Sequence, residues 1–497
     1  MIFAAKIVSV LTGLIFQFLV AQYTLSQPGQ YDIWFNIADV LAYFTLLMGV
    51  VPFWVMRFVA RRKEGAAKTG LVATLIISII GTVVYLAFIP FVLSSLGISV
   101  NYLPIYLIVS FQIAELYIIS VLEACIQATI PQSVGYGIIV QQIGKVTLGF
   151  ILIVYLGQPL LGAVLATIIA FAVQVAYYYR LLADHFKEPI HWGYVKEWLK
   201  GSVINIYNVI GTQLAAYVLI LLYALGGLGS RGRFGAAVQI TNVISYASFL
   251  AFALYPKLLA DRKSEDVTTS LKIVLMFSIP MTAIAMALAP LYITILRPDF
   301  PDAAILVVVL AADTLISVVS GIYGAALFGM ENVDQEKISF KKLLRSKIFV
   351  AFSLPYIQAA FTIPIAYYAL TTFAYNLPYE ASLSITVINT AAHFAMFIAV
   401  YALVRKMIKI EIPWRNISKY AFAAIITGII LLLAPHFTSA LLAVDITEKV
   451  IAILETLVLT GVGAGIYLAI LVAIDKEARL LPKNILKEIR GKNNANS

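Results

Sequence analysis

The sequence has few charged residues and almost no cysteine. Only 12% of its 497 residues are Asp, Glu, Lys or Arg, and 62% are hydrophobic, whereas about a quarter of the residues in a water-soluble domain are charged. The single cysteine, Cys125, excludes an intramolecular disulfide. Apolar runs recur along the whole chain with short polar gaps between them, and no gap is long enough for a soluble domain.

Several motifs of enzymes are absent as well. The chain has no Gly-x-x-x-x-Gly-Lys loop, no His-Glu-x-x-His motif, no pair of cysteines and no Asp-x-Asp triplet. These absences remove the simplest ATPases and metal-dependent enzymes. We therefore expect no enzyme, no metal and no cofactor.

The apolar runs predict an all-α polytopic membrane protein. Crossing a bilayer takes about 20 apolar residues of helix, and about fourteen stretches of the chain satisfy this requirement. The expected spans are residues 2–23, 33–56, 69–95, 104–127, 135–155, 160–179, 201–225, 232–255, 271–296, 302–329, 348–370, 382–403, 420–442 and 448–473.

The distribution of basic residues predicts the orientation in the membrane. If the chain starts in the cytoplasm, 30 of its 35 Lys and Arg residues lie on the cytoplasmic side. Because cationic loops are retained on that side, we expect both termini in the cytoplasm and the spans in the plasma membrane. The basic clusters adjoin apolar runs, so they indicate contact with anionic lipid and not with nucleic acid.

Two parts of the chain share a pattern. Gly29-Gln30-Tyr31 precedes a span, and Pro52 follows 23 residues after the glycine; Gly232-Arg233-Phe234 and Pro256 repeat this with 24 residues between them. The offset is 203 residues, or six spans, and an even number of spans relates the copies by an axis along the membrane normal. The alternative is that any membrane hairpin ends in such residues.

The repeat predicts two pseudo-symmetric six-helix bundles and two further helices. Residues 190–200 and the C-terminal tail mix apolar and basic residues at helical spacing, which is typical of helices that lie on a membrane surface. The expected parts are a first bundle (1–180), an interfacial amphipathic linker (181–200), a second bundle (201–405), helices 13 and 14 (406–473) and a cytoplasmic tail (474–497).

Ionisable residues lie deep inside the expected spans. Glu115, Lys145, Asp313 and His393 are each about 15 Å from a span end. Such groups are costly in lipid and mark a protein interior or a wet cavity. Lys145 either attracts a phosphate in a cavity or forms a structural ion pair with Glu115. Asp313 is either a proton or cation site or a hydrogen-bonded carboxyl group, and we expect His393 to be packed and hydrogen-bonded.

Two sets of polar residues are candidates for function. The Asn and Gln side chains among them are suited to binding sugar hydroxyl groups, although interhelical hydrogen bonds explain these residues almost as well. The candidates for the substrate cavity are Lys145, Arg231, Arg233, Gln141, Asn205, Asn208, Gln239 and Asn242. The candidates for ion or proton coupling are Asp39, Glu115, Glu123 and Asp313.

Short motifs resemble a known family. Gly29-Gln30-Tyr31 with Arg57 behind it, and the stretch from Gly232-Arg233-Phe234 through Ala253-Leu254-Tyr255-Pro256, resemble polysaccharide exporters of the oligosaccharide flippase type. Pro290 followed by Leu296 to Phe300 is also similar to them. Their superfamily, the multidrug/oligosaccharidyl-lipid/polysaccharide (MOP) exporters, also contains multidrug and toxin extrusion antiporters and lipid II flippases. The resemblance covers nearly the whole chain.

The resemblance implies a transporter that flips a polyprenyl- or dolichyl-(pyro)phosphate glycan outward by alternating access, for cell-surface polysaccharide or glycoprotein assembly. It implies that basic residues hold the pyrophosphate, and Arg57, Lys145, Arg231 and Arg233 are the positions that match. The implied partners are the lipid-linked oligosaccharide, membrane lipids, and glycosyltransferases or a polymerase or ligase of the same pathway. The alternatives are a cation-coupled multidrug antiporter and, disfavoured by the missing acidic motifs, a membrane-embedded glycosyl-transferring enzyme.

Overall fold

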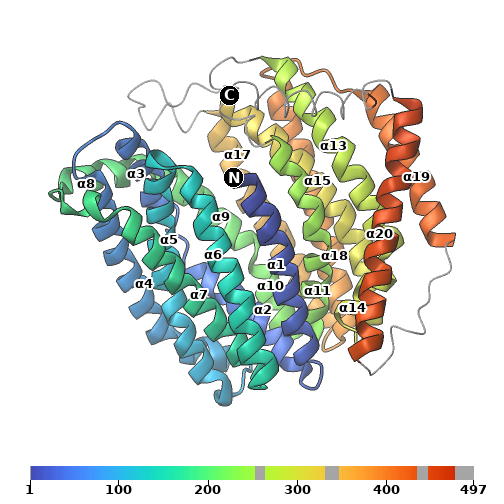
Figure 1. Ribbon diagram of the computed structural model, residues 1–497, viewed down its shortest axis with the longest axis horizontal. Helices are drawn as coiled ribbons and strands as arrows, with labels where there is room; N and C mark the ends of the chain where they lie inside the picture. The colour runs from blue at the N-terminus through green and yellow to red at the C-terminus, as the bar shows by residue number, and fades with distance from the viewer. Residues whose placement is uncertain (1, 252–262, 331–345, 434–445, 476–478, 480–497) are drawn as a thin grey trace, which may run out of the picture. The chain divides into compact units, whose positions relative to one another are not determined.

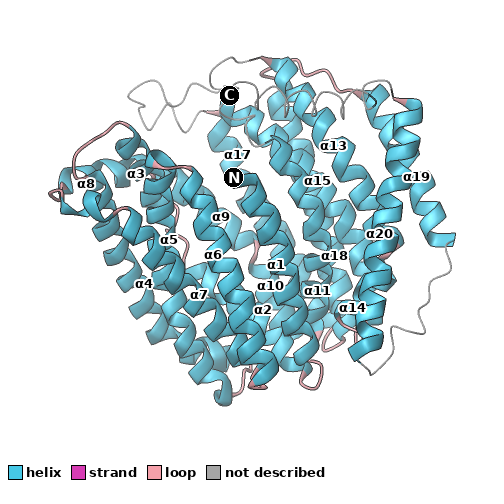
Figure 2. Cartoon of the chain, viewed as in Figure 1, coloured by secondary structure: helices cyan, strands magenta, loops and turns pink. Residues whose placement is uncertain are grey.

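A computed structural model describes residues 2–251, 263–330, 346–433, 446–475 and 479, and all regular secondary structure in these ranges is helical (Figures 1 and 2). The α-helices are α1 (Ile2–Tyr23), α2 (Pro28–Phe44), α3 (Val50–Ala60), α4 (Ala66–Ser95), α5 (Leu103–Thr129), α6 (Gln132–Gly149), α7 (Pro159–Leu181), α8 (Trp192–Gly201), α9 (Val203–Ala215), α10 (Tyr217–Leu225), α11 (Ser230–Ser245), α13 (Ser264–Ala287), α14 (Ala289–Leu296), α15 (Ala304–Met330), α17 (Lys347–Thr372), α18 (Pro378–Arg405), α19 (Trp414–Leu433) and α20 (Ile446–Ile474). The 3-10 helices are η1 (Val100–Tyr102), η3 (Ala183–Lys187), η4 (Tyr246–Ala251) and η5 (Pro301–Ala303), and η2 (Phe150–Tyr155) is a π-helix.

The helices confirm the all-α membrane fold. Within the described ranges, twelve helices are long and apolar enough to cross a membrane, and Leu11–Tyr23 and Val50–Ala60 form two shorter apolar helices. In the described part of the chain, each of the fourteen expected spans overlaps one helix or two consecutive helices. The amphipathic segment after residue 190 is also a helix, α8.

Three expected spans are not continuous helices, and here the prediction was wrong. The span expected at 33–56 is interrupted between α2 and α3 at residues 45–49, the span expected at 201–225 is interrupted at Ala216, and the span expected at 271–296 is interrupted at Leu288. Pro52 lies in the first turn of α3, and Pro290 lies in the first turn of α14. A proline has no N–H to donate and its ring clashes with the preceding turn, so a helix starts near it more easily than it passes through it.

The chain divides into two compact units. Unit 1 comprises residues 1–235 and 352–385, and unit 2 comprises residues 236–351 and 386–497. Helices α11, α17 and α18 therefore each contribute residues to both units. The division expected at 1–180, 181–200, 201–405, 406–473 and 474–497 stays a prediction.

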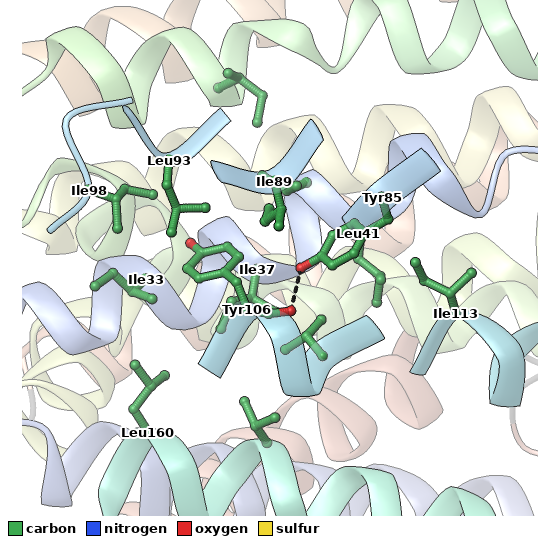
Figure 3. Packing of buried hydrophobic residues seen from close by; sticks show 14 of the residues in the cluster. Ile33, Ile37, Leu41, Tyr85, Ile89, Leu93, Ile98, Tyr106, Ile113 and Leu160 are labelled. Atoms are coloured by element: carbon green, nitrogen blue, oxygen red, sulfur yellow. Dashed lines mark hydrogen bonds between the residues drawn. The ribbon is translucent and has the colours of Figure 1, made fainter. Parts of the chain in front are cut away.

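Buried tyrosines fix α2, α4 and α5 in unit 1. Tyr85 and Tyr106 are almost fully buried among isoleucines and leucines of these helices (Figure 3). The Tyr85 hydroxyl donates to the Tyr106 carbonyl oxygen at 2.8 Å, and the Tyr106 hydroxyl donates to Asn36 Oδ1 at 2.6 Å. Because buried polar groups are costly without partners, these bonds hold α2 in one register against α5.

The helix α8 is attached to α3 through aromatic side chains. Trp198 is fully buried and meets the ring of Phe58 at 5.4 Å between centroids. Trp54 Nε1 donates to Ser202 Oγ at 2.8 Å, directly after α8. One face of α8 therefore packs on protein, while Trp192 and Leu199 are exposed. Its location at the membrane surface stays a prediction.

Some expectations concern residues outside the described ranges. The end of the second copy of the repeat, from Ala253 to Pro256, and most of the tail expected at 474–497 fall there.

Candidate substrate and ion sites

Arg231 and Asp39 form a buried ion pair in unit 1. Arg231 Nε lies 2.6 Å from Asp39 Oδ2, and Nη2 lies 2.9 Å from Oδ1. The two side chains are only 7% and 12% exposed. The Arg231 guanidinium also lies over the rings of Phe35 (5.0 Å) and Phe234 (5.5 Å). The structure thus joins a candidate for the substrate cavity to a candidate for ion coupling, and each neutralises the other's charge.

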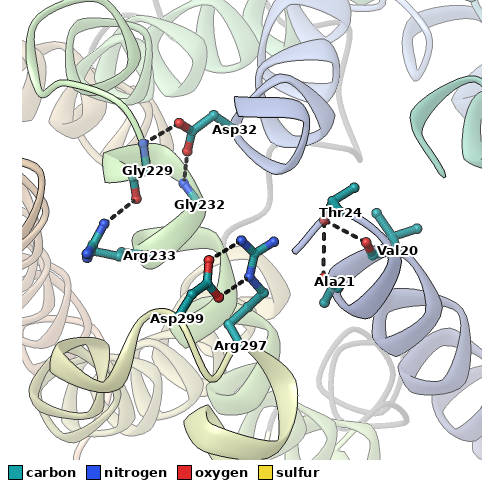
Figure 4. Close-up of polar contacts among 9 residues, drawn as sticks. All are labelled: Val20, Ala21, Thr24, Asp32, Gly229, Gly232, Arg233, Arg297 and Asp299. Atoms are coloured by element: carbon teal, nitrogen blue, oxygen red, sulfur yellow. Dashed lines mark hydrogen bonds and ion pairs between the residues drawn. The ribbon is translucent and has the colours of Figure 1, made fainter. Parts of the chain in front are cut away.

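Asp32, which was not among the candidates, holds the start of α11. Its Oδ2 accepts from Gly229 N at 2.5 Å, and its Oδ1 accepts from Gly232 N at 2.6 Å (Figure 4). These N–H groups belong to the positive end of the helix dipole, which favours a carboxylate. Asp32 directly follows the Gly29-Gln30-Tyr31 motif, and an acidic residue directly before an expected apolar span was the signal that could have revealed it.

Lys145 lies deep in a span without a carboxylate partner. It is about 20 Å from the start of α6 and about 15 Å from the end of η2 along the helix. Its ammonium group lies 4.8 Å from the centre of the Phe16 ring on α1, and α1 and α6 lie side by side (Figure 1). Among the described residues, Lys145 forms no ion pair with Glu115 or with another acidic side chain.

Further candidates lie on α5 and α6. Gln141 lies one turn earlier on α6 and is buried. Glu115 on α5 has a buried Oε2 atom with no hydrogen-bond partner among the described residues. Glu123, two turns further along α5, is instead satisfied: its Oε1 accepts from Gln174 Nε2 at 3.1 Å and lies 3.1 Å from the Tyr178 hydroxyl. Of the two glutamates, Glu115 is therefore the one that has a buried carboxylate oxygen without a hydrogen-bond partner among the described residues.

In unit 2, Asp313 on α15 and His393 on α18 are paired. His393 Nδ1 lies 2.8 Å from Asp313 Oδ1, and their side chains are 38% and 11% exposed in the order His393, Asp313. Tyr323, further along α15, packs edge-on against Phe397 and Tyr401 of α18 and keeps the two helices in register. The sequence had placed Asp313 and His393 at similar depth but did not pair them.

The other basic candidates lie near helix ends. Arg57, in the last turn of α3, lies over the Phe53 ring at 4.1 Å. Arg233, in the first turn of α11, donates from Nη1 to the Gly229 carbonyl oxygen at 3.4 Å. Arg297, a further basic residue directly after α14, is fully buried and donates to both carboxylate oxygens of Asp299 at 2.7 and 2.5 Å.

The amide candidates lie on two helices. Asn205 and Asn208 are partly buried on α9, where the neighbouring Tyr207 stacks on Tyr356 at 4.4 Å between ring centroids. On α11, Gln239 is partly buried and Asn242 is exposed. Their role in binding a substrate stays a prediction.

No family model and no curated protein matches the sequence, but solved structures match the fold. An inward-facing multidrug resistance MATE family transporter of the MOP superfamily has a TM-score of 0.60 and 15% identity, over 80% of this chain and 95% of that chain. The lipid II flippase MurJ, in an inward closed conformation, has a TM-score of 0.60 and 13% identity, over 94% of this chain and 99% of that chain. A MATE structure in the straight conformation has a TM-score of 0.54 and 17% identity, over 82% of this chain and 94% of that chain.

The chain therefore has the fold shared by these MOP-superfamily transporters. The fold that the resemblance implied is confirmed. The more specific resemblance to polysaccharide exporters stays a prediction.

Proposed function

We propose that the protein is a membrane transporter that flips a lipid-linked oligosaccharide, a polyprenyl- or dolichyl-(pyro)phosphate glycan, to the outer leaflet by alternating access. The observation that carries this proposal is Lys145, a cation deep in a span without a carboxylate partner among the described residues. A charge at this depth is costly unless an opposite charge meets it. The phosphate groups of a lipid carrier would supply that charge.

The ion pairs narrow the set of basic residues for this role. Arg231 is engaged by Asp39 and Arg297 by Asp299, so a phosphate would have to compete with a carboxylate at either position. Among the residues that the structure describes, Lys145 has no such competitor. Arg57 and Arg233, near helix ends, are suited to the entry and exit of the substrate.

The share of this chain that each solved structure matches also favours a flippase. The MATE structures match 80% and 82% of this chain, whereas the lipid II flippase matches 94%. The two helices expected at 406–473, in addition to the two bundles, therefore favour the flippase over the antiporter.

The alternative is a cation-coupled multidrug antiporter. It is supported by the fold of the MATE neighbours and by the Asp313–His393 pair, which is suited to exchanging a proton. A glycosyl-transferring enzyme is less well supported, because the neighbours reported above are transporters. We further propose that the protein resides in the plasma membrane with both termini in the cytoplasm, and that it works beside enzymes that build or polymerise the glycan.

The test is reconstitution of the purified protein into vesicles with a fluorescent undecaprenyl-pyrophosphate glycan, with an impermeant quencher reporting translocation. We expect translocation by the wild type and a loss of at least about tenfold in Lys145→Gln, because a charge-assisted contact contributes about 1.5–3 kcal/mol. Lys196→Gln, at an exposed lysine of α8, is the matched control and should retain activity. Absence of translocation of any prenyl-phosphate glycan by the wild type would refute the proposal.

A further inference from the structure

A cavity of about 340 Å³ lies at one end of unit 1, where the start of α2 meets the connections α4–η1, α10–α11 and α17–α18. Its volume is within the range of small-molecule sites, about 300–1,000 Å³. Asn376 N donates to the Leu225 carbonyl oxygen at 3.0 Å, which ties the α17–α18 connection to the end of α10. None of the cavity and coupling candidates predicted from the sequence lines it.

Tyrosines dominate the polar lining of this cavity. Tyr102, Tyr223 and Tyr375 lie on three different connections or helix ends and all contribute to it. None of their hydroxyl groups forms a hydrogen bond with another residue in the described part of the chain. Each hydroxyl group therefore remains available to donate and accept. Ile33 and Ile98 add apolar surface beside the rings.

The charge of the lining excludes two classes of ligand. Among the described residues, the lining contains no Lys, Arg or His, and its one charged residue is Asp32. A phosphate would meet this carboxylate without any cation to offset the repulsion. A cation would find both carboxylate oxygens already engaged by Gly229 N and Gly232 N. The remaining class is an uncharged ligand that has both hydroxyl groups and apolar faces.

We propose that this cavity binds uncharged sugar rings of a glycan. The C–H faces of a sugar ring pack on aromatic rings, and its hydroxyl groups pair with tyrosine hydroxyl and asparagine amide groups. The identity of this glycan rests on the proposed function, in which it is the oligosaccharide of the lipid that the protein flips. The positive-inside pattern predicts that this end of unit 1 faces outward, where the glycan arrives, while its pyrophosphate stays with the basic residues.

The test measures binding of free oligosaccharides to the full chain, without any transport step. The protein is placed in lipid nanodiscs free of sugar-containing detergent, and saturation-transfer NMR is recorded with neutral tetrasaccharides of glucose, mannose, galactose and N-acetylglucosamine. We expect at least one to bind. Tyr102→Phe and Tyr223→Phe, which remove only a hydroxyl group, should each weaken binding about 3- to 10-fold.

Two further variants make the result specific to the cavity. Tyr155→Phe removes the hydroxyl group of an exposed tyrosine outside the cavity and should leave binding unchanged. Leu228→Trp enlarges a lining side chain that is 67% exposed, so it should fold normally and block binding.

Three outcomes would overturn the inference: no tetrasaccharide binds, the cavity variants and Tyr155→Phe behave alike, or inorganic pyrophosphate or an alkylammonium ion binds in the cavity instead. The translocation assay separates this inference from the proposed function. If lipid-linked glycan is flipped but no free glycan binds, the cavity assignment fails alone. If free glycan binds in the cavity but no prenyl-phosphate glycan is flipped, the proposed function fails and the sugar site stands.

Discussion

Arg231 and Asp39 lie 192 positions apart in the chain and share two short charge-assisted hydrogen bonds. The sequence had suggested a separate role for each, the arginine with substrate phosphate and the aspartate with a coupling ion. Once paired, neither is available unless the pair opens. At the residue scale, a buried charge therefore has to be judged together with its partner, and Lys145, which has none among the described residues, differs from Arg231 in this respect.

We expect Arg231→Met to destabilise the protein strongly. It leaves Asp39 as a buried carboxylate without its partner, and breaking such a pair costs about 3–5 kcal/mol. The double variant Arg231→Met/Asp39→Leu removes both charges and should recover most of the loss. Thermal unfolding in detergent, followed by intrinsic fluorescence, measures both effects. Arg61→Met, at an exposed arginine, is the control, and an equal loss there would contradict the explanation.

The Asp313–His393 pair predicts coupling to protons. Substitution by Asp313→Asn or His393→Gln removes a group that can exchange a proton. In vesicles, we expect transport by either variant to lose its response to an imposed pH gradient while downhill exchange continues. Glu455→Gln changes another carboxyl group within a span and should keep the response. A full response in both variants would exclude the pair as the proton site.

At the scale of elements, the Asp32 carboxylate of α2 caps the start of α11. The first N–H groups of a helix have no partner within it, and Asp32 accepts from two N–H groups at this start. The connection α10–α11 is thereby fixed to α2. Arg231 of α11 is brought opposite Asp39, which lies on α2 as Asp32 does. The breaks at Pro52 and Pro290 are likewise features of elements, because each proline sets where a helix begins.

We expect Asp32→Ala to loosen the start of α11. The substitution leaves Gly229 N and Gly232 N without their acceptor, at a cost of about 1–3 kcal/mol for each N–H that stays buried and unpaired. The readout is faster hydrogen exchange at residues 229–233, together with a lower unfolding temperature. Asp184→Ala removes the carboxylate of a fully exposed pair with Lys187 and should change neither, because exposed pairs contribute little. Unchanged exchange at 229–233 in Asp32→Ala would show that the cap is dispensable.

At the scale of the whole molecule, the predicted orientation can be measured directly. Because Cys125 is the only cysteine and is buried, a Cys125→Ala chain is a clean background for single cysteines. We expect Val100→Cys, exposed before α5, to react with an impermeant maleimide on intact cells, and Glu197→Cys, exposed on α8, to react only after the membrane is opened. The reverse labelling would contradict the predicted topology and the outward location of the sugar site.

The sequence by itself determined the membrane class, the helical fold and the approximate bounds of the spans. The physical reason is that lipid imposes a long apolar run on every spanning helix, and this requirement can be read without knowing what packs against what. The depths of Lys145, Asp313 and His393 also followed from the sequence, since depth depends only on the rise of the helix.

Only the tertiary structure decided which polar groups are partners. The pairs Arg231–Asp39 and Asp313–His393, and the bonds of Asp32, join helices that are far apart in the chain, and one apolar span can face its neighbours in many ways. The same holds for the tyrosine cavity of unit 1, whose lining comes from four separate segments of the chain. Hydropathy constrains where a residue lies along the membrane normal, but the packing of side chains between helices selects its neighbours.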